Sequence, residues 1–99
     1  MVVSNWLLGH SIYMTYYNVD INMASYSGKL AQRFRILRER TGLSQEVVAH
    51  RAGLSTYTYQ KFEKGESSPG NPMNPRLNTL LALCDVFGIT VAELLDFGE

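Results

Sequence analysis

The sequence predicts an all-α protein made of five short helices. Apolar residues recur at helical spacing, as Leu30, Phe34 and Leu37 do on one face of the first helix. Ser, Thr or Asn residues precede the periodic segments and glycines follow most of them, a pattern typical of helix starts and ends. Because the chain has 99 residues, we expect these helices to share one modest core.

The first two helices are predicted from their ends. The first begins at Gly28 and stops before Gly42, which follows a charged last turn. Ser44 is the predicted N-cap of the second helix, and Glu46 lies in its first turn, where the helix dipole favours an acid. Gly53 ends this helix, and the intervening Val47–Ala49 supplies apolar residues for burial.

The third segment, Ser55–Phe62, first looks like a strand because Thr and Tyr alternate in it. A helix explains both of its flanks better. Ser55 becomes the N-cap, Leu54 and Tyr59 form a hydrophobic staple, and Gly65 ends the helix. Tyr59 and Phe62 then share the buried face, while Thr56, Tyr57, Gln60 and Lys61 point outward.

A loop, Glu66–Asn74, precedes the last two helices. Asn74 is the predicted cap of the fourth helix and Pro75 its first residue, a position that proline favours. Thr90 and Glu93 form a capping box for a short fifth helix. The predicted apolar stripe of the fourth helix consists of Leu77, Leu80, Leu81, Cys84 and Phe87.

Residues 1–27 are expected to be an extension of the domain formed by residues 28–99. In the first 22 residues, which are rich in apolar and aromatic side chains, Asp20 is the only charged one. Ile12–Ile21 has strand-like composition, so a β-like arm that pairs with another copy is one interpretation. There are two alternatives. The segment is an apolar flap over the domain, or it is sequence that comes from a vector or from a start upstream of Met23. The pattern fits neither a signal peptide nor a membrane span, and we expect a cytoplasmic protein.

Charge is unevenly distributed although the formal net charge is zero. Residues 28–64 carry eight Lys or Arg against three Glu, whereas residues 65–99 carry one Arg against five acids. The basic half suggests a polyanionic partner, and an ordinary mixed surface is the alternative. The single cysteine, Cys84, is expected in the core, and His10 and His50 lack spaced ligand partners. We therefore expect no metal and no cofactor, and no catalytic constellation indicates an enzyme.

The second and third helices are joined by a Gly-containing turn at Ala52–Leu54, which is the helix-turn-helix arrangement. Over residues 29–96 the sequence resembles the helix-turn-helix domain of the Cro and lambda-type repressors, the XRE family. The resemblance implies a five-helix, lambda-repressor-like DNA-binding fold. The matching features are Arg38, Leu43-Ser44-Gln45-Glu46, Ala49, Gly53-Leu54-Ser55, Tyr59, Phe62-Glu63-Lys64-Gly65 and Leu80 to Leu95.

The second helix of such a motif enters the DNA major groove, where side chains near its start meet base edges. Threonine methyls and a tyrosine ring can contact thymine methyls, and a lysine can reach guanine or a phosphate. Tyr57 departs from the small or amide residue that is common in the family. The residues expected to contact bases are Ser55, Thr56, Tyr57 and Lys61.

Phosphate contacts are expected from Gln45, Lys64, Arg38 and Ser67. The family resemblance implies a phosphate contact for Gln45, and it implies that Arg38 pairs with Glu63. The connection from Gly65 to Pro75 is longer than is usual in the family. It is either a neutral spacer or a further source of phosphate contacts.

The expected function is sequence-specific binding of double-stranded DNA by a transcriptional regulator, a homodimer on a two-half-site operator. One alternative is an antitoxin-type regulator with a toxin, or another regulator, as protein partner. The other is a protein-interaction module that has lost DNA binding, which the net charge of zero favours.

Overall fold

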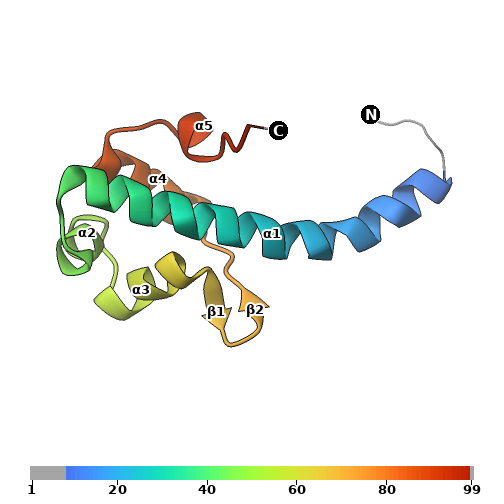
Figure 1. The fold of residues 1–99 in the computed structure, drawn as a ribbon, viewed down its shortest axis with the longest axis horizontal. Coiled ribbons are helices and arrows are strands. Elements are labelled where there is room, and N and C mark those ends of the chain that lie inside the picture. The colour runs from blue at the N-terminus through green and yellow to red at the C-terminus, as the bar shows by residue number, and fades with distance from the viewer. Residues whose placement is uncertain (1–8, 99) are drawn as a thin grey trace.

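A computed structural model describes the backbone of residues 9–98 and the side chains of residues 25–98. Five helices and one small hairpin make up this part of the chain (Figure 1). The all-α fold class is confirmed. The elements are α1 (Gly9–Thr41), α2 (Gln45–Arg51), α3 (Thr56–Lys64), β1 (Glu66–Ser68), β2 (Asn71–Pro72), α4 (Leu77–Phe87) and α5 (Val91–Leu94).

The first helix is much longer than the sequence suggests. It spans 33 residues, and its N-terminal half projects away from the other helices (Figure 1). The β-like alternative for Ile12–Ile21 is therefore wrong, because this segment is helical. Strand propensity is a weak preference, and no proline interrupts the chain before Pro69. Residues 1–8 of the predicted extension lie outside the described residues.

Three of the predicted helix caps are confirmed, those at Ser44, Ser55 and Thr90. The hydroxyls of Ser44, Ser55 and Thr90 accept hydrogen bonds from backbone N–H groups in the first turns of α2, α3 and α5. Thr90 and Glu93 form the complete capping box. These bonds satisfy backbone donors that have no partner within a helix, so short helices acquire defined starts.

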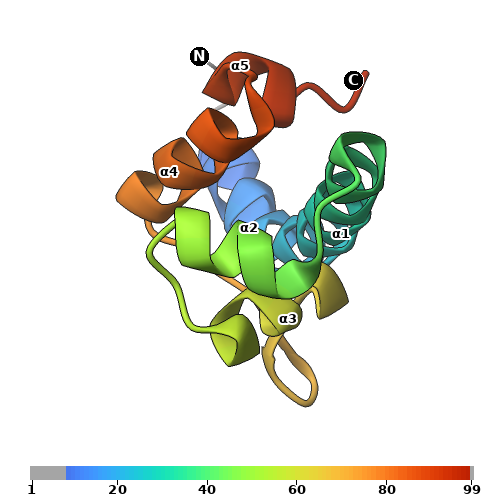
Figure 2. The ribbon, with the colours of Figure 1, turned by 90° about the vertical axis from the view of Figure 1, so that its left-hand side faces the viewer.

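The core lies between α1 and the shorter helices. Figure 2 looks along α1, with α2 and α3 in front. Phe34 of α1 is fully buried at its centre. Its ring centroid lies 6.3 Å from that of Tyr59, 6.2 Å from that of Phe62 and 6.3 Å from that of Phe87. The expected burial of Tyr59 and Cys84 is confirmed. One aromatic side chain of α1 thus contacts aromatic rings of both α3 and α4.

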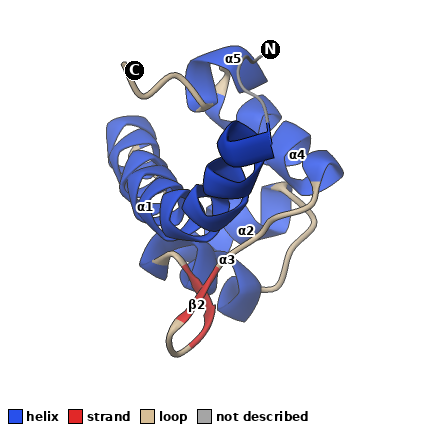
Figure 3. Ribbon diagram, turned by 90° about the vertical axis from the view of Figure 1, so that its right-hand side faces the viewer, coloured by secondary structure: helices blue, strands red, loops and turns tan. Residues whose placement is uncertain are grey.

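The connection after α3 is a β-hairpin rather than an irregular loop (Figure 3). Its strands pair Glu66 with Pro72 and Ser68 with Asn71. The turn residues between them are Pro69 and Gly70, the pair that a type II turn favours. Gly70 has the positive φ of 81° that this position requires. The Pro-Gly pair was the sequence signal for this hairpin.

The fourth helix starts later than predicted, and its buried face matches the predicted stripe only in part. Cys84 and Phe87 are buried and Leu80 is half-buried, as the stripe predicts. It begins at Leu77, after an N-cap at Arg76, so Asn74 and Pro75 precede the helix. Leu77 and Leu81 are exposed, whereas Leu83 is fully buried. Periodicity alone did not decide between these faces, because five of the helix's eleven residues are leucine or phenylalanine.

Candidate nucleic-acid interface

The outward face of α3 carries the residues expected to contact bases. The Tyr57 side chain is 69% exposed, while Thr56, Gln60 and Lys61 are half-buried. On the opposite face Tyr59 is fully buried against Phe34. The core therefore holds α3 in place while its first turn remains open to a partner.

The Ser55 hydroxyl is engaged in the helix cap. Its Oγ accepts from the Thr58 backbone N–H at 3.1 Å and donates to the Thr58 Oγ1 at 2.9 Å. A hydroxyl has one proton, and Ser55 donates it to Thr58. A partner can therefore bond Ser55 only by donating a hydrogen bond to its oxygen.

Tyr57 and Lys61 lie on the same strip of α3 because they are four positions apart in the sequence. The Lys61 Nζ sits 4.8 Å from the centroid of the Tyr57 ring. A cation over the ring of an exposed tyrosine contributes on the order of 0.5–1 kcal/mol. The contact places the Lys61 amine and the Tyr57 ring together on the outward face of α3.

Behind this surface, Glu63 is the centre of a hydrogen-bond network. Arg38 donates to the Glu63 carboxylate through Nε at 2.6 Å and through Nη2 at 3.1 Å. The Gln45 Nε2 donates to the same carboxylate at 2.9 Å, and the Gln60 Nε2 donates to the Gln45 Oε1 at 3.2 Å. The structure thus brings together one residue of α1, one of α2 and two of α3.

The network keeps Glu63 ionised although its side chain is only 4% exposed. Burial by itself would raise the pKa of the Glu63 carboxyl, but hydrogen bonds from Arg38 and Gln45 outweigh it, so the pKa is lowered. The hydrogen bond to Glu63 raises the pKa of the Arg38 guanidinium. Both groups therefore carry full charge near neutral pH.

Sequence reasoning missed a second arginine at this place. The Arg35 Nη1 donates to the backbone carbonyl of Glu63, and Arg35 lines a hollow that is shared with Lys64. The hollow also contains Gln45, Gln60 and Glu63. Arg35 and Glu63 are 28 residues apart in the chain, and no local pattern links them.

A family model described as a helix-turn-helix domain matches residues 29–97. The chain belongs to the helix-turn-helix family. The resemblance to this family drawn from the sequence is therefore confirmed. The two helices of the helix-turn-helix motif are α2 and α3. The turn between them contains Gly53, whose φ is 74°.

Two curated relatives match over most of this chain. The Cryptic phage CTXphi transcriptional repressor RstR of Vibrio cholerae is 35% identical over 69 residues, which are 70% of this chain and 57% of that protein. The HTH-type transcriptional regulator DdrOP3 of Deinococcus deserti is 37% identical over 71 residues, 72% of this chain and 50% of that protein. The chain thus spans about half the length of these two relatives.

The expected phosphate contact Ser67 lies apart from the Glu63 network of the helix-turn-helix. It is exposed on β1, and its Oγ donates to the Pro72 carbonyl at 3.5 Å. The base of the hairpin is attached to α1, because the buried Ser27 Oγ donates to the Met73 carbonyl at 3.0 Å. The hairpin therefore has a defined position beside the end of α3.

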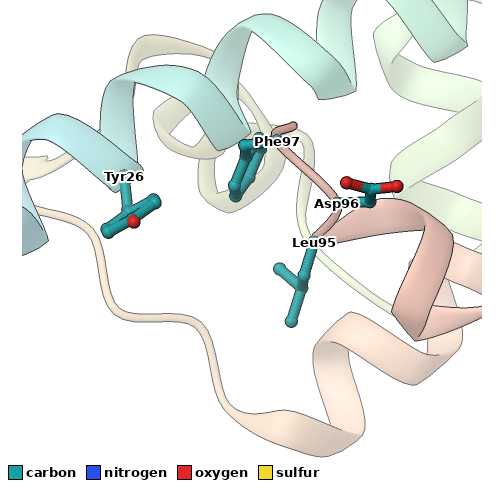
Figure 4. Close-up of a pocket in the computed structure, with 4 residues that line it drawn as sticks. All are labelled: Tyr26, Leu95, Asp96 and Phe97. Atoms are coloured by element: carbon teal, nitrogen blue, oxygen red, sulfur yellow. The ribbon is translucent and has the colours of Figure 1, made fainter. Parts of the chain in front are cut away.

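An apolar hollow lies elsewhere, beside α1 at the C-terminal end of the helix-turn-helix domain (Figure 4). Tyr26 and Phe97 line it with ring centroids 5.7 Å apart, and Leu95 and Asp96 complete it. Arg33 holds the end of α5 in place by donating to three backbone carbonyls, those of Glu93, Leu94 and Asp96, at 2.7–3.0 Å.

Within the described part of the chain, no group of three or more His, Cys, Asp or Glu side chains is arranged to hold a metal ion. No helix in the same range combines the length and apolar character needed to cross a membrane. His50 is exposed on α2, and Cys84 is a free buried thiol whose pKa is raised by burial.

Proposed function

We propose that this protein is a sequence-specific DNA-binding transcriptional regulator that places α3 in the major groove. The observation that carries the proposal is the two-sided character of α3. Tyr59 fixes one side in the core, and Tyr57 on the other side is 69% exposed. A fixed helix whose first turn is open is what groove recognition requires. Membership of the helix-turn-helix family and the two regulator relatives support the same function.

In this proposal, bases are read from the start of α3. Thr56 and Tyr57 contact base edges or thymine methyls, and Lys61 reaches a guanine or a nearby phosphate. Ser55, whose proton is used in the cap, accepts a hydrogen bond from a base amine. The contact between Lys61 and Tyr57 keeps both side chains on the groove-facing strip.

Backbone contacts come from residues around this strip. Lys64 is exposed at the end of α3, and Ser67 is exposed on the hairpin. Gln45 has one amide proton left after its bond to Glu63, so it can donate to a phosphate. Arg38 is committed mainly to Glu63, and its role is to position α3, with a phosphate contact as a secondary contribution.

The regulator is proposed to act as a homodimer on two half-sites about 34 Å apart, the spacing of one DNA turn. The projecting N-terminal half of α1 supports this, because it extends beyond the domain and can reach a second copy (Figure 1). A dimer doubles the number of base contacts, and one domain of this size reads few bases.

Selection of bound sequences from a pool of random DNA duplexes tests this function. We expect one enriched motif, with affinity that falls steeply as salt rises because phosphate contacts release counterions. A pool that yields no enriched motif even at low salt would favour the alternative of a protein-interaction module, which the net charge of zero suggests. Weak binding that is equal for all sequences would also contradict specific regulation.

A further inference from the structure

The hollow that contains Arg35 has the chemistry of an anion site. It lies where α1, α2 and α3 meet, and it is lined by Arg35, Gln45, Gln60, Glu63 and Lys64. Two of these side chains are cations, two are amides and one is a carboxylate. Whether the hollow attracts an anion depends on how far the carboxylate neutralises the two cations.

The carboxylate is already occupied. Both Glu63 oxygens accept hydrogen bonds from Arg38, and Oε1 also accepts from Gln45. Arg35 instead donates to the Glu63 backbone carbonyl, which orients the guanidinium without cancelling its charge. Within residues 25–98, neither Arg35 nor Lys64 forms a salt bridge. The hollow therefore carries two cations whose charges are not paired.

The position of the hollow relates it to the groove-facing strip. Gln60 and Lys64 follow Thr56 by one and two turns of α3, so Lys64 lies about 12 Å along the helix from Thr56 at a rise of 1.5 Å per residue. The major groove is also about 12 Å wide. A helix that inserts its first turn into the groove thus brings its last turn to the phosphates along the groove edge.

We propose that Arg35 and Lys64 together bind one phosphodiester of the DNA backbone. This inference rests on the proposed function and adds Arg35, a residue of α1, to the DNA-binding surface. Arg35 provides a planar guanidinium with two or more free N–H groups for the phosphate oxygens, and Lys64 provides a mobile charge. Gln45 and Gln60 each retain one amide proton that can point into the hollow.

The test compares Arg35→Gln with Arg40→Gln in the full chain. Both variants remove one positive charge from α1, but Arg40 lines a different hollow, with Ile89 and Glu93. Binding to a mixed-sequence duplex and to the selected motif is measured against KCl concentration. The slope of log affinity against log salt is negative. For Arg35→Gln we expect it to become less steep by about 0.9, the value for one phosphate. The loss should be equal for both duplexes.

The outcomes separate this inference from the proposed function. If the wild type binds with a steep salt slope and Arg35→Gln has the same slope, Arg35 contacts no phosphate and the inference is wrong while the function stands. An equal drop in slope for Arg40→Gln would also overturn it, because only overall charge would then matter. If the wild type itself binds no duplex, the proposed function fails first. Circular dichroism melting of each variant identifies a loss that comes from unfolding.

Discussion

Arg38, near the end of α1, holds the carboxylate of Glu63, in the last turn of α3, through two hydrogen bonds of 2.6 and 3.1 Å. Glu63 is 4% exposed, so its charge is almost fully removed from water. The pair joins the first helix to the helix proposed to enter the groove, and Gln45 ties α2 to the same carboxylate. All three helices of the proposed DNA-binding surface thus meet at one buried charge.

Arg38→Ala is therefore expected to destabilise the fold by roughly 3 kcal/mol, because it leaves the Glu63 charge buried without its main partner. Urea unfolding followed by circular dichroism measures the change. Arg40→Ala is the matched control, since Arg40 is exposed on the same helix, and it should change stability by less than about 0.5 kcal/mol. Equal effects of the two substitutions would show that the pair adds nothing specific.

Stability should decrease in acid because of Glu63. Its pKa is lower in the folded than in the unfolded chain, so the unfolded chain binds more protons as the pH falls. The contribution is complete above the unfolded value of about 4.3 and is lost as the pH falls through the lower folded value. Unfolding midpoints in urea, measured between about pH 6 and pH 3, test this. Glu63→Gln should flatten this dependence, and an unchanged acid limb would contradict the assignment.

Gly65 and Gly28 should respond in opposite directions to alanine. Gly65 has a φ of 82°, and a Cβ there would lie 3.1 Å from the Ser27 carbonyl oxygen and 3.3 Å from the Ala31 Cβ. We expect Gly65→Ala to cost about 1–3 kcal/mol. Gly28 lies inside α1 with no atom within 4 Å of an added Cβ, so Gly28→Ala should stabilise by about 0.5–1 kcal/mol. Thermal melts of both variants give the two signs directly.

Base and phosphate contacts should be distinguishable by substitution. Thr56→Ala is expected to relax sequence preference at one or two positions, at a cost on the order of 1–3 kcal/mol for the preferred site. Lys64→Ala should weaken binding to all duplexes alike and reduce the salt slope by about one unit. Repeating the random-duplex selection with each variant measures the sequence preference, and binding titrations against KCl measure the affinity and the salt slope. A change of preferred motif in Lys64→Ala would reverse the two assignments.

The proposed arm is tested by comparing the full chain with a chain that starts at Met23. The shorter chain lacks the projecting part of α1 and should lose dimer mass in sedimentation equilibrium, since that part extends beyond the domain (Figure 1). Its melting curve shows whether the rest of the domain remains folded. A dimer of unchanged strength would mean that the arm does not join the two copies.

The local chemistry of most helix ends was predictable from the sequence, although the start of α1 and the cap of α4 were not. The caps at Ser44, Ser55 and Thr90 and the left-handed glycines at 65 and 88 depend on neighbouring residues alone, so a linear pattern is sufficient to find them. The same holds for the buried face of α3. Tyr59 and Phe62 are three positions apart, close to one helical turn, and both pack at the core. The family followed from these features in combination.

Only the tertiary structure decided which residues meet across the chain. Arg35, Arg38, Gln45 and Glu63 come from three helices, and their contacts depend on how those helices pack around Phe34. The choice between Leu81 and Leu83 for burial likewise required the neighbouring helices, because both lie on an apolar helix. Sequence periodicity determines which side chains share a face of a helix. Long-range packing determines which face is buried and which charges remain unpaired for a partner.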